Sequence, residues 1–115
     1  MADVILVEAT ETFTHVAVWG RLDAAGVGEV ELKLTSHTVS RHKPAVIELS
    51  DVTFIASLGI GMLVTIARSM RAHGVGLALM VGDTPVREVL EMMTIGSVIP
   101  IVATRAEALD KLGVS

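Results

Sequence analysis

The sequence contains no cysteine and very few aromatic residues. The absence of cysteine excludes a disulfide framework and any zinc site built on thiolates, and it fits a reducing compartment. Aromatic residues make up 3% of the chain, whereas hydrophobic residues make up 51%. The core must therefore consist of aliphatic side chains, which favours packed layers of helices and strands, an α/β protein.

The chain also lacks a cluster of basic residues and a long apolar run. With a net charge of −4, it has no basic surface that could neutralise nucleic acid or an anionic bilayer. No run approaches the roughly 18 apolar residues of a membrane span, and the start, MADV, carries an acid where a signal peptide carries bases. We therefore expect a cytoplasmic protein that neither binds nucleic acid nor inserts into a membrane. The length predicts one domain, residues 1–115.

Signals of catalysis are missing as well. The four histidines, at positions 15, 37, 42 and 73, show no metal-ligand spacing and are interpreted as surface or hydrogen-bonded residues. A nucleophile elbow has glycine two residues before its serine, but Ile55 stands there before Ser57. The stretch GIG at 59–61 lacks the third glycine of a dinucleotide loop. The sequence predicts no enzyme, no metal and no cofactor.

Hydrophobic periodicity predicts the element order ββαβαβαβα, a mixed sheet of about five strands with about four helices. The expected strands cover residues 4–8, 13–19, 45–49, 77–81 and 98–102. The expected helices cover residues 24–40, 57–73, 85–96 and 104–113. The apolar strand 77–81 is expected at the centre of the sheet, and strand 98–102, with its proline, at an edge.

Two of the helices show clear inner stripes. Leu63, Ile66, Ala67 and Met70 recur at helical spacing in the second helix, which ends at His73 and Gly74. The third helix has the stripe Val86, Val89, Leu90 and Met93. We expect Met92 and Met93 to lie mostly in the core, with a place on an adaptable partner surface as the alternative for Met92. Asp83 to Pro85 provides the start of this helix, and the stretch TRAE at 104–107 is a capping box for the last one.

The second, third and fourth strands are expected to be parallel, because helices connect them. Their carboxyl ends then lie at one edge of the sheet, where open α/β sheets place their sites. Three loops meet there: residues 20–23, residues 56–57 and residues 82–83. The edge therefore gathers Asp23, Ser57 and Asp83, which are far apart in the sequence.

Ser57 is the best functional candidate in the chain. It stands where an apolar strand gives way to a helix, so its hydroxyl either caps the first turn or presents a site for phosphate beside free backbone amides. Gly59 and Gly61 each cost the helix roughly 1 kcal/mol relative to alanine. Either a partner approaches the backbone there, or the helix start packs closely on the sheet. Asp23 likewise is either a helix cap or a recognition group.

The stretches GRLD at 20–23 and DVTFIASLGIG at 51–61 resemble the motifs of the STAS domain of bacterial anti-sigma factor antagonists. The family commonly shows Gly-Glu-Leu-Asp in the first place and Asp-Ser-Ser/Thr-Gly-Leu-Gly in the second. Asp23, Gly59 and Gly61 match this pattern. Ala56 replaces the family's aspartate, and Leu58 replaces its second hydroxyl residue.

The resemblance implies that Ser57 is the residue phosphorylated by a partner anti-sigma factor, a serine kinase that brings its own ATP, and that a phosphatase resets it. The implied function is that of an anti-sigma factor antagonist without catalysis of its own. The alternative is a non-cycling STAS adaptor in a transporter ATPase complex or a signalling assembly, which Ala56 favours. The expected partner surface consists of Asp23, Ala56, Ser57, Leu58, Gly59, Ile60, Gly61 and Asp83.

Overall fold

The computed structural model describes residues 1–114. Within these residues, five strands form one sheet in the order β1-β2-β3-β4-β5, and four α-helices accompany it. The strands are β1 (Ala2–Ala9), β2 (Thr14–Leu22), β3 (Ala45–Ile55), β4 (Leu77–Met80) and β5 (Ile101–Val102). The helices are α1 (Ala24–His37), α2 (Ser57–Ala72), α3 (Pro85–Met92) and α4 (Arg105–Lys111), with short 3₁₀ helices η1 (Val39–Arg41) and η2 (Ile95–Ser97). The predicted α/β class and element order are confirmed.

The sheet is mixed, as expected. β1 pairs with β2 in antiparallel fashion, and β2, β3, β4 and β5 run parallel to one another. The expectation that residues 77–81 form the central strand is wrong, because β3 occupies the middle and β4 lies between β3 and the short β5. β4 is nevertheless apolar throughout, since both of its faces are covered.

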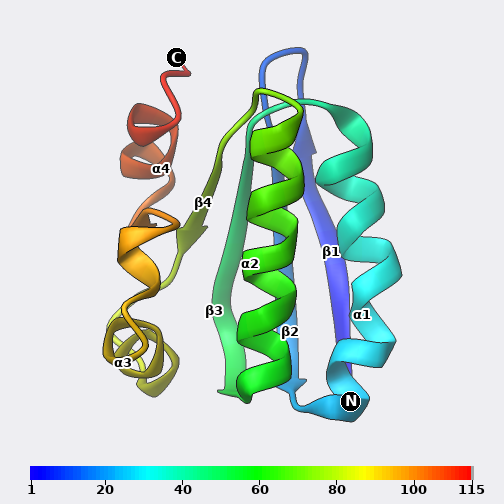
Figure 1. Ribbon diagram of the computed structural model, residues 1–115, viewed down its shortest axis with the longest axis vertical. Coiled ribbons are helices and arrows are strands. Elements are labelled where there is room, and N and C mark those ends of the chain that lie inside the picture. Colours follow the sequence, from blue (N-terminus) through cyan, green and yellow to red (C-terminus); the bar gives the residue numbers. More distant parts are fainter. Residues whose placement is uncertain (115) are drawn as a thin grey trace.

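Helices cover the two faces of the sheet unequally. Figure 1 shows α1 and α2 side by side on one face, in front of β1, β2 and β3, while α3 and α4 lie beyond β4. The main core fills the space between the sheet and helices α1, α2 and α3. A smaller cluster joins α4 to the opposite face over β3, β4 and β5.

Helix α2 packs through the stripe that the sequence predicted. Leu63, Ile66 and Met70 are buried against the sheet, whereas Arg68 and Arg71 are exposed. Burying a leucine or isoleucine side chain contributes about 1.5–3 kcal/mol, so this stripe supplies most of what holds the helix on the sheet.

The first helix ends earlier than expected. It stops at His37 rather than at residue 40, because the hydroxyl of Thr38 donates a hydrogen bond to the Leu34 carbonyl (2.7 Å) and the chain turns into η1. His42 then takes a left-handed conformation (φ 57°) before the chain enters β3.

The third helix and last strand are also shorter than expected. Helix α3 ends at Met92, and Thr94 in a left-handed conformation (φ 58°) leads into η2. Met92 is 82% exposed and Met93 is 54% exposed, so the expectation that both lie in the core is wrong. β5 contains only Ile101 and Val102, because Pro100 before it has no amide to pair.

Strand β3, in contrast, continues well past residue 49. It pairs with β4 only over residues 45–48, and its second half pairs with β2 alone, up to the pair Leu22 and Ile55. This extension carries Phe54 and Ile55 beyond the end of β4 and leads directly into α2.

Candidate functional site at the start of helix α2

The carboxyl ends of β2 and β3 meet where α1 and α2 begin, at the lower edge of Figure 1. The amide of Ala56 donates to the Leu22 carbonyl (3.0 Å), which ties the loop after β3 to the loop after β2. The predicted meeting of residues 20–23 with residues 56–57 is therefore confirmed. The loop with Asp83 follows the parallel neighbour β4 and leads into α3.

Ser57 is the first residue of α2, and its side chain is exposed. The N-cap position belongs to Ala56, whose side chain caps nothing, so the interpretation of Ser57 as a helix cap is wrong. The first hydrogen bond of the helix runs from the Ile60 amide to the Ala56 carbonyl (3.1 Å). The amides of Ser57, Leu58 and Gly59 thus precede the helical hydrogen bonds, as the first turn of any α-helix requires.

The other three α-helices begin differently. Asp23 caps α1, Thr84 caps α3 and Thr104 caps α4, each accepting a hydrogen bond from an amide of the first turn. Among residues 1–114, α2 is the one α-helix whose start has no side-chain cap. The Ser57 hydroxyl and the first amides of α2 are therefore both available to an incoming group.

Asp23 fits the capping interpretation closely. Its Oδ1 accepts a hydrogen bond from the Gly26 amide (2.9 Å), and its Oδ2 lies 3.4 Å from Nε of Arg21. The Gly26 hydrogen bond, helped by Arg21, holds the pKa of the Asp23 carboxyl below its ordinary value of 3.8. Asp23 is therefore charged at neutral pH and fixed in place.

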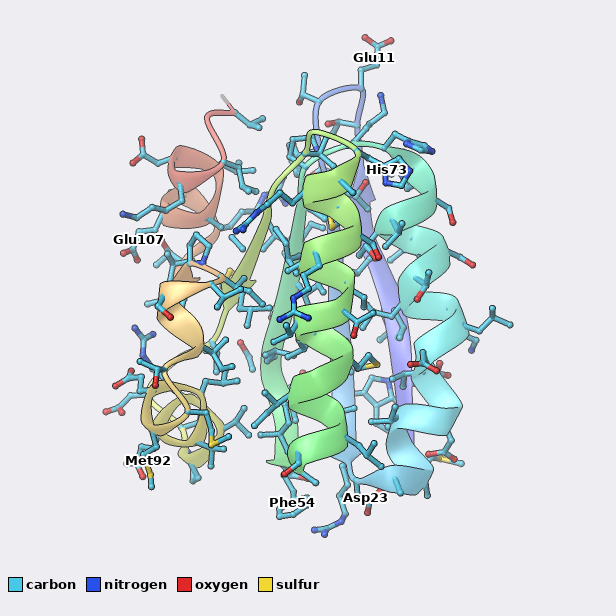
Figure 2. All side chains as sticks on the ribbon, viewed as in Figure 1. Glu11, Asp23, Phe54, His73, Met92 and Glu107 are labelled. Atoms are coloured by element: carbon cyan, nitrogen blue, oxygen red, sulfur yellow. The ribbon has the colours of Figure 1, made fainter. Side chains whose placement is uncertain are left out.

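Phe54 is a surface residue of this edge that the sequence reasoning missed. It pairs across the strands with Arg21, whose guanidinium lies 4.4 Å from the centre of the Phe54 ring. Figure 2 shows the Phe54 and Asp23 side chains at the same end of the molecule. An aromatic residue in the mostly aliphatic chain, three positions before Ser57, was the available signal.

The two glycines of the motif have different roles. At Gly59, an added Cβ would lie 2.9 Å from Cγ1 of Ile55 and 3.0 Å from Cβ of Leu22, so close packing on the sheet requires glycine. At Gly61, an added Cβ would meet no heavy atom within 4 Å. Packing thus explains why residue 59 is glycine, but it does not explain why residue 61 is glycine.

Gly61 lies instead in a groove between α1 and α2. The groove has a volume of about 380 Å³ and begins at Ser57. Its lining residues are Val27, Glu31, Ser57, Leu58, Gly61, Met62 and Thr65. Leu58 is 59% exposed beside it, an apolar side chain at the surface. Glu31 was not predicted, because only the packing of α1 beside α2 brings it to this groove, and Thr65 lies further along α2 itself.

Asp83 is exposed, and no ion pair within residues 1–114 involves it. Next to its loop, a small apolar recess of about 80 Å³ separates the end of β3 from α3. Thr53, Phe54 and Ile55 line one side, and Pro85, Val86 and Val89 line the other. Of the predicted surface residues, Gly59 and Ile60 are buried, and Ala56 is partly exposed.

The family model of the STAS domain matches residues 4–108. The chain belongs to the STAS domain family. The match spans all five strands except the first two residues of β1, all of α1, α2 and α3, and the first half of α4. The resemblance found in the two motifs is therefore confirmed over almost the full length of the sequence.

Several solved structures share the fold of this STAS domain. An anti-sigma factor antagonist from Mycobacterium paratuberculosis has a TM-score of 0.81 and 20% identity, covering 98% of this chain and 95% of that one. An anti-sigma-factor antagonist (STAS) domain protein from Planctomyces limnophilus has a TM-score of 0.73 and 22% identity, covering 97% and 98%. The Bacillus cell fate determinant SpoIIAA in its phosphorylated form has a TM-score of 0.63 and 20% identity, covering 94% and 97%. A search of curated protein sequences gave no significant match.

Other kinds of site were also considered. No group of three or more potential ligands that could hold a metal ion is found among residues 1–114. No helix in the same part of this STAS domain is long and apolar enough to cross a membrane. His15 corrects the interpretation of the histidines: it is buried, and its Nε2 lies 2.8 Å from Glu48, but its Nδ1 has no hydrogen-bond partner in the described chain.

Proposed function

We propose that this STAS domain is an anti-sigma factor antagonist that binds a partner switch kinase and is regulated by phosphorylation of Ser57. The observation that carries the proposal is the accessible serine at the uncapped start of α2. Ser57 offers an exposed hydroxyl that takes part in no hydrogen bond with the described residues, at a helix start without a side-chain cap. A kinase can therefore reach the hydroxyl without breaking any structural contact.

A phosphoryl group at Ser57 would be well tolerated by the fold. It carries about −1.5 to −2 charges, and the free amides and the dipole of a helix N-terminus favour an anion. The first turn of α2 contains no acidic residue that would repel it. Phosphorylation should thus leave the domain folded and change only the surface that a partner meets.

The partner surface combines an apolar contact with two fixed charges. Leu58 supplies exposed apolar area beside Ser57, and Gly61 leaves the groove between α1 and α2 open. In this proposal, Asp23 and Asp83, on the loops after β2 and β4, contribute negative charge to the surface that the partner meets. Ala56, Gly59 and Ile60 shape it from below by setting the direction in which α2 leaves the sheet. A phosphoryl group would add bulk and negative charge at its centre.

Catalysis belongs to the partner in this proposal. The kinase supplies ATP and transfers the phosphoryl group, and a separate phosphatase removes it. SpoIIAA, a protein of the same fold, is known in a phosphorylated and an unphosphorylated form, which supports a phosphorylation cycle. The STAS domain itself acts by binding or not binding.

The alternative function is that of an adaptor that never cycles through phosphate and holds a transporter ATPase complex or a signalling assembly together. One observation favours it: Ala56 stands where the family commonly has an aspartate. Restoring that residue with Ala56→Asp should speed phosphorylation of Ser57 by a cognate kinase. An unchanged rate would show that this chain does not depend on the position.

The test is titration calorimetry against a candidate anti-sigma kinase from the same organism. Ser57→Asp should fold normally and bind about a hundredfold more weakly, a loss of about 2.8 kcal/mol. Ser57→Ala should bind like the wild type but take up no phosphate from ATP in an intact-mass measurement. Ser40→Asp is the matched control, because Ser40 is exposed in η1, after the far end of α1.

Two results would contradict the phosphorylation switch. One is equal affinity of Ser57→Asp and Ser57→Ala for the kinase. The other is phosphate on Ser57→Ala at the wild-type level. Binding without any phosphorylation of the wild type would instead support the adaptor.

A further inference from the structure

On the face of β1 and β2 that points away from α1, the part around Ile5, Ala17 and Trp19 is not covered by any helix of the described chain. Phe13 and His15, further back on the same side, are buried. Val16, Val18 and Leu22 of β2 pack in the core with α1, so the alternating residues His15, Ala17, Trp19 and Arg21 point to the other face. On that face, α4 packs over β3, β4 and β5. Arg105 of α4 pairs with Glu8 of β1 and lies over the ring of Phe13, which directly precedes β2.

The strand register places defined rows of side chains on this open face. Trp19 lies between Asp3 of β1 and Asp51 of β3. One row further along, Ala17 lies between Ile5 and Glu48. Residues directly opposite one another in a sheet are neighbours, so the single tryptophan of the chain lies next to Asp51, while the Asp3 carboxylate on its other side is held by Lys33 of α1.

The open face is apolar at its centre. Ile5 is 55% exposed, and Trp19 and Ala17 are partly exposed. An antiparallel pair such as β1 and β2 can leave one face to solvent, and that face is then usually polar. An uncovered face with tryptophan and isoleucine side by side is the kind of patch that marks an interaction site.

The charges around the patch are only partly neutralised. Asp3 pairs with Lys33 (2.8 Å), while Glu48 contacts only the imidazole of His15. Asp51 is exposed, and no ion pair within residues 1–114 involves it. A cation over an indole ring is attracted by its π-electrons, and Asp51 beside Trp19 would add to this attraction. Arg21, on the same face, contacts Asp23 and the Phe54 ring, so Trp19 beside Asp51 suits a lysine or arginine side chain of a partner.

These charges argue against a second copy of this chain as the occupant. Two such faces in contact would bring Asp51 and Glu48 of each copy toward the carboxylates of the other. Pairing through the edge of β1 is hindered too, because the amides of Ala2 and Val4 already donate to the carboxylates of Glu29 (2.9 Å) and Asp3 (2.8 Å). A basic partner meets neither obstacle.

We propose that the open face of β1 and β2, defined by Ile5, Ala17, Trp19, Glu48 and Asp51, is a docking surface for a basic amphipathic segment of a protein partner. Apolar side chains of the segment lie on Ile5 and Ala17, and a lysine or arginine lies over Trp19 beside Asp51. The surface is separate from the Ser57 edge, so a partner held here could stay bound through a phosphorylation cycle. It does not depend on the function proposed above.

The emission of Trp19 tests this proposal directly, because the chain has only one tryptophan. The probe is a short peptide of alternating lysine and leucine, titrated at low salt, with a peptide of alternating glutamate and leucine as its counterpart. The basic peptide should change the Trp19 emission in a saturable and salt-sensitive way, and the acidic peptide should not. Asp51→Asn should weaken this binding about three- to fivefold, the range of one surface charge contact.

Glu88→Gln is the matched control, because it removes one exposed charge from α3, outside this face. It should leave the affinity unchanged. Four results would overturn the proposal: no change in emission with the basic peptide, an equal response to both peptides, equal weakening by Asp51→Asn and Glu88→Gln, or self-association in sedimentation that Asp51→Asn strengthens. The last result would assign the face to a second copy of the chain.

Discussion

The starts of α1 and α2 lie at the same edge of the sheet, yet they differ in how their first turns are satisfied. At α1, Asp23 caps the Gly26 amide and is itself held by Arg21. At α2, Ala56 caps nothing, and the Ser57 hydroxyl is exposed. The start of α1 is closed by a charged side chain, whereas the start of α2 is open to an incoming group.

Helix α2 can lack a cap because it buries more residues against the rest of the domain than α1 does. Helix α2 has sixteen residues and buries Gly59, Ile60, Met62, Leu63, Ile66, Ala67 and Met70. Helix α1 has fourteen residues and buries Gly26, Val27, Val30 and Leu34. Most helical stability in proteins comes from packing of the apolar face, so α2 can forgo a cap worth about 1 kcal/mol. A helix start can thus be freed for function when burial elsewhere holds the helix.

The largest expected effect tests whether burial holds α2. Leu63→Ala should lower the free energy of unfolding by about 2–5 kcal/mol, because it removes a fully buried side chain and leaves a cavity. Urea denaturation measures this loss. Arg68→Ala, on the exposed side of the same helix, is the control and should change stability by less than about 0.5 kcal/mol. A loss below about 1 kcal/mol for Leu63→Ala would show that the stripe does not carry the helix.

The next effect separates the two glycines at the start of α2. Gly59→Ala should cost about 1–3 kcal/mol, because the new methyl group overlaps Ile55 and Leu22. Gly61→Ala, in open space, should instead stabilise the fold by up to about 1 kcal/mol. Thermal and urea unfolding of the two variants measure both signs. Equal effects of the two substitutions would refute the division between a packing glycine and a groove glycine.

A third variant makes the start of α2 resemble the start of α1. Ala56→Asp places a carboxylate at the N-cap position and should raise the free energy of unfolding by about 1 kcal/mol. The gain should vanish at low pH, when the new carboxyl is protonated. If stability does not rise, then the free amides of this first turn are not available to an anion, and the case for a phosphoryl group there is weakened.

The smallest effect concerns the pH dependence of the cap on α1. Because the Gly26 hydrogen bond lowers the pKa of Asp23 in the folded state, the charged cap stabilises the fold above the unfolded value of 3.8. That contribution is lost as the pH falls through the folded pKa. Asp23→Asn keeps an oxygen for the cap but cannot titrate, so its stability should fall less than that of the wild type between about pH 5 and pH 3. An equal loss of unfolding free energy in the two proteins over this pH range, measured by urea denaturation, would contradict a contribution from the titration of Asp23.

Much of the fold could be predicted from the sequence, because its signals are local. The order of elements, the parallel pairing of β2, β3 and β4, and the inner stripe of α2 follow from periodicity and from helical connections. The motif around Ser57 and Asp23 was sufficient to suggest the family. Errors arose where a short contact decided the outcome: the Thr38 hydroxyl ended α1 early, and the left-handed Thr94 left Met93 exposed.

The sequence by itself determined the aliphatic α/β architecture, the family and the placement of Ser57 between a strand and a helix, since each depends on residue type and spacing along the chain. Only the tertiary structure decided which glycine is needed for packing, that Ala56 rather than Ser57 holds the cap position, and that Phe54 joins Arg21 beside Asp23. It also decided that Trp19 lies between Asp3 and Asp51 in the sheet, on the face that points away from α1. These features depend on which strands and helices become neighbours, and no local pattern in a single sequence encodes the register between distant segments.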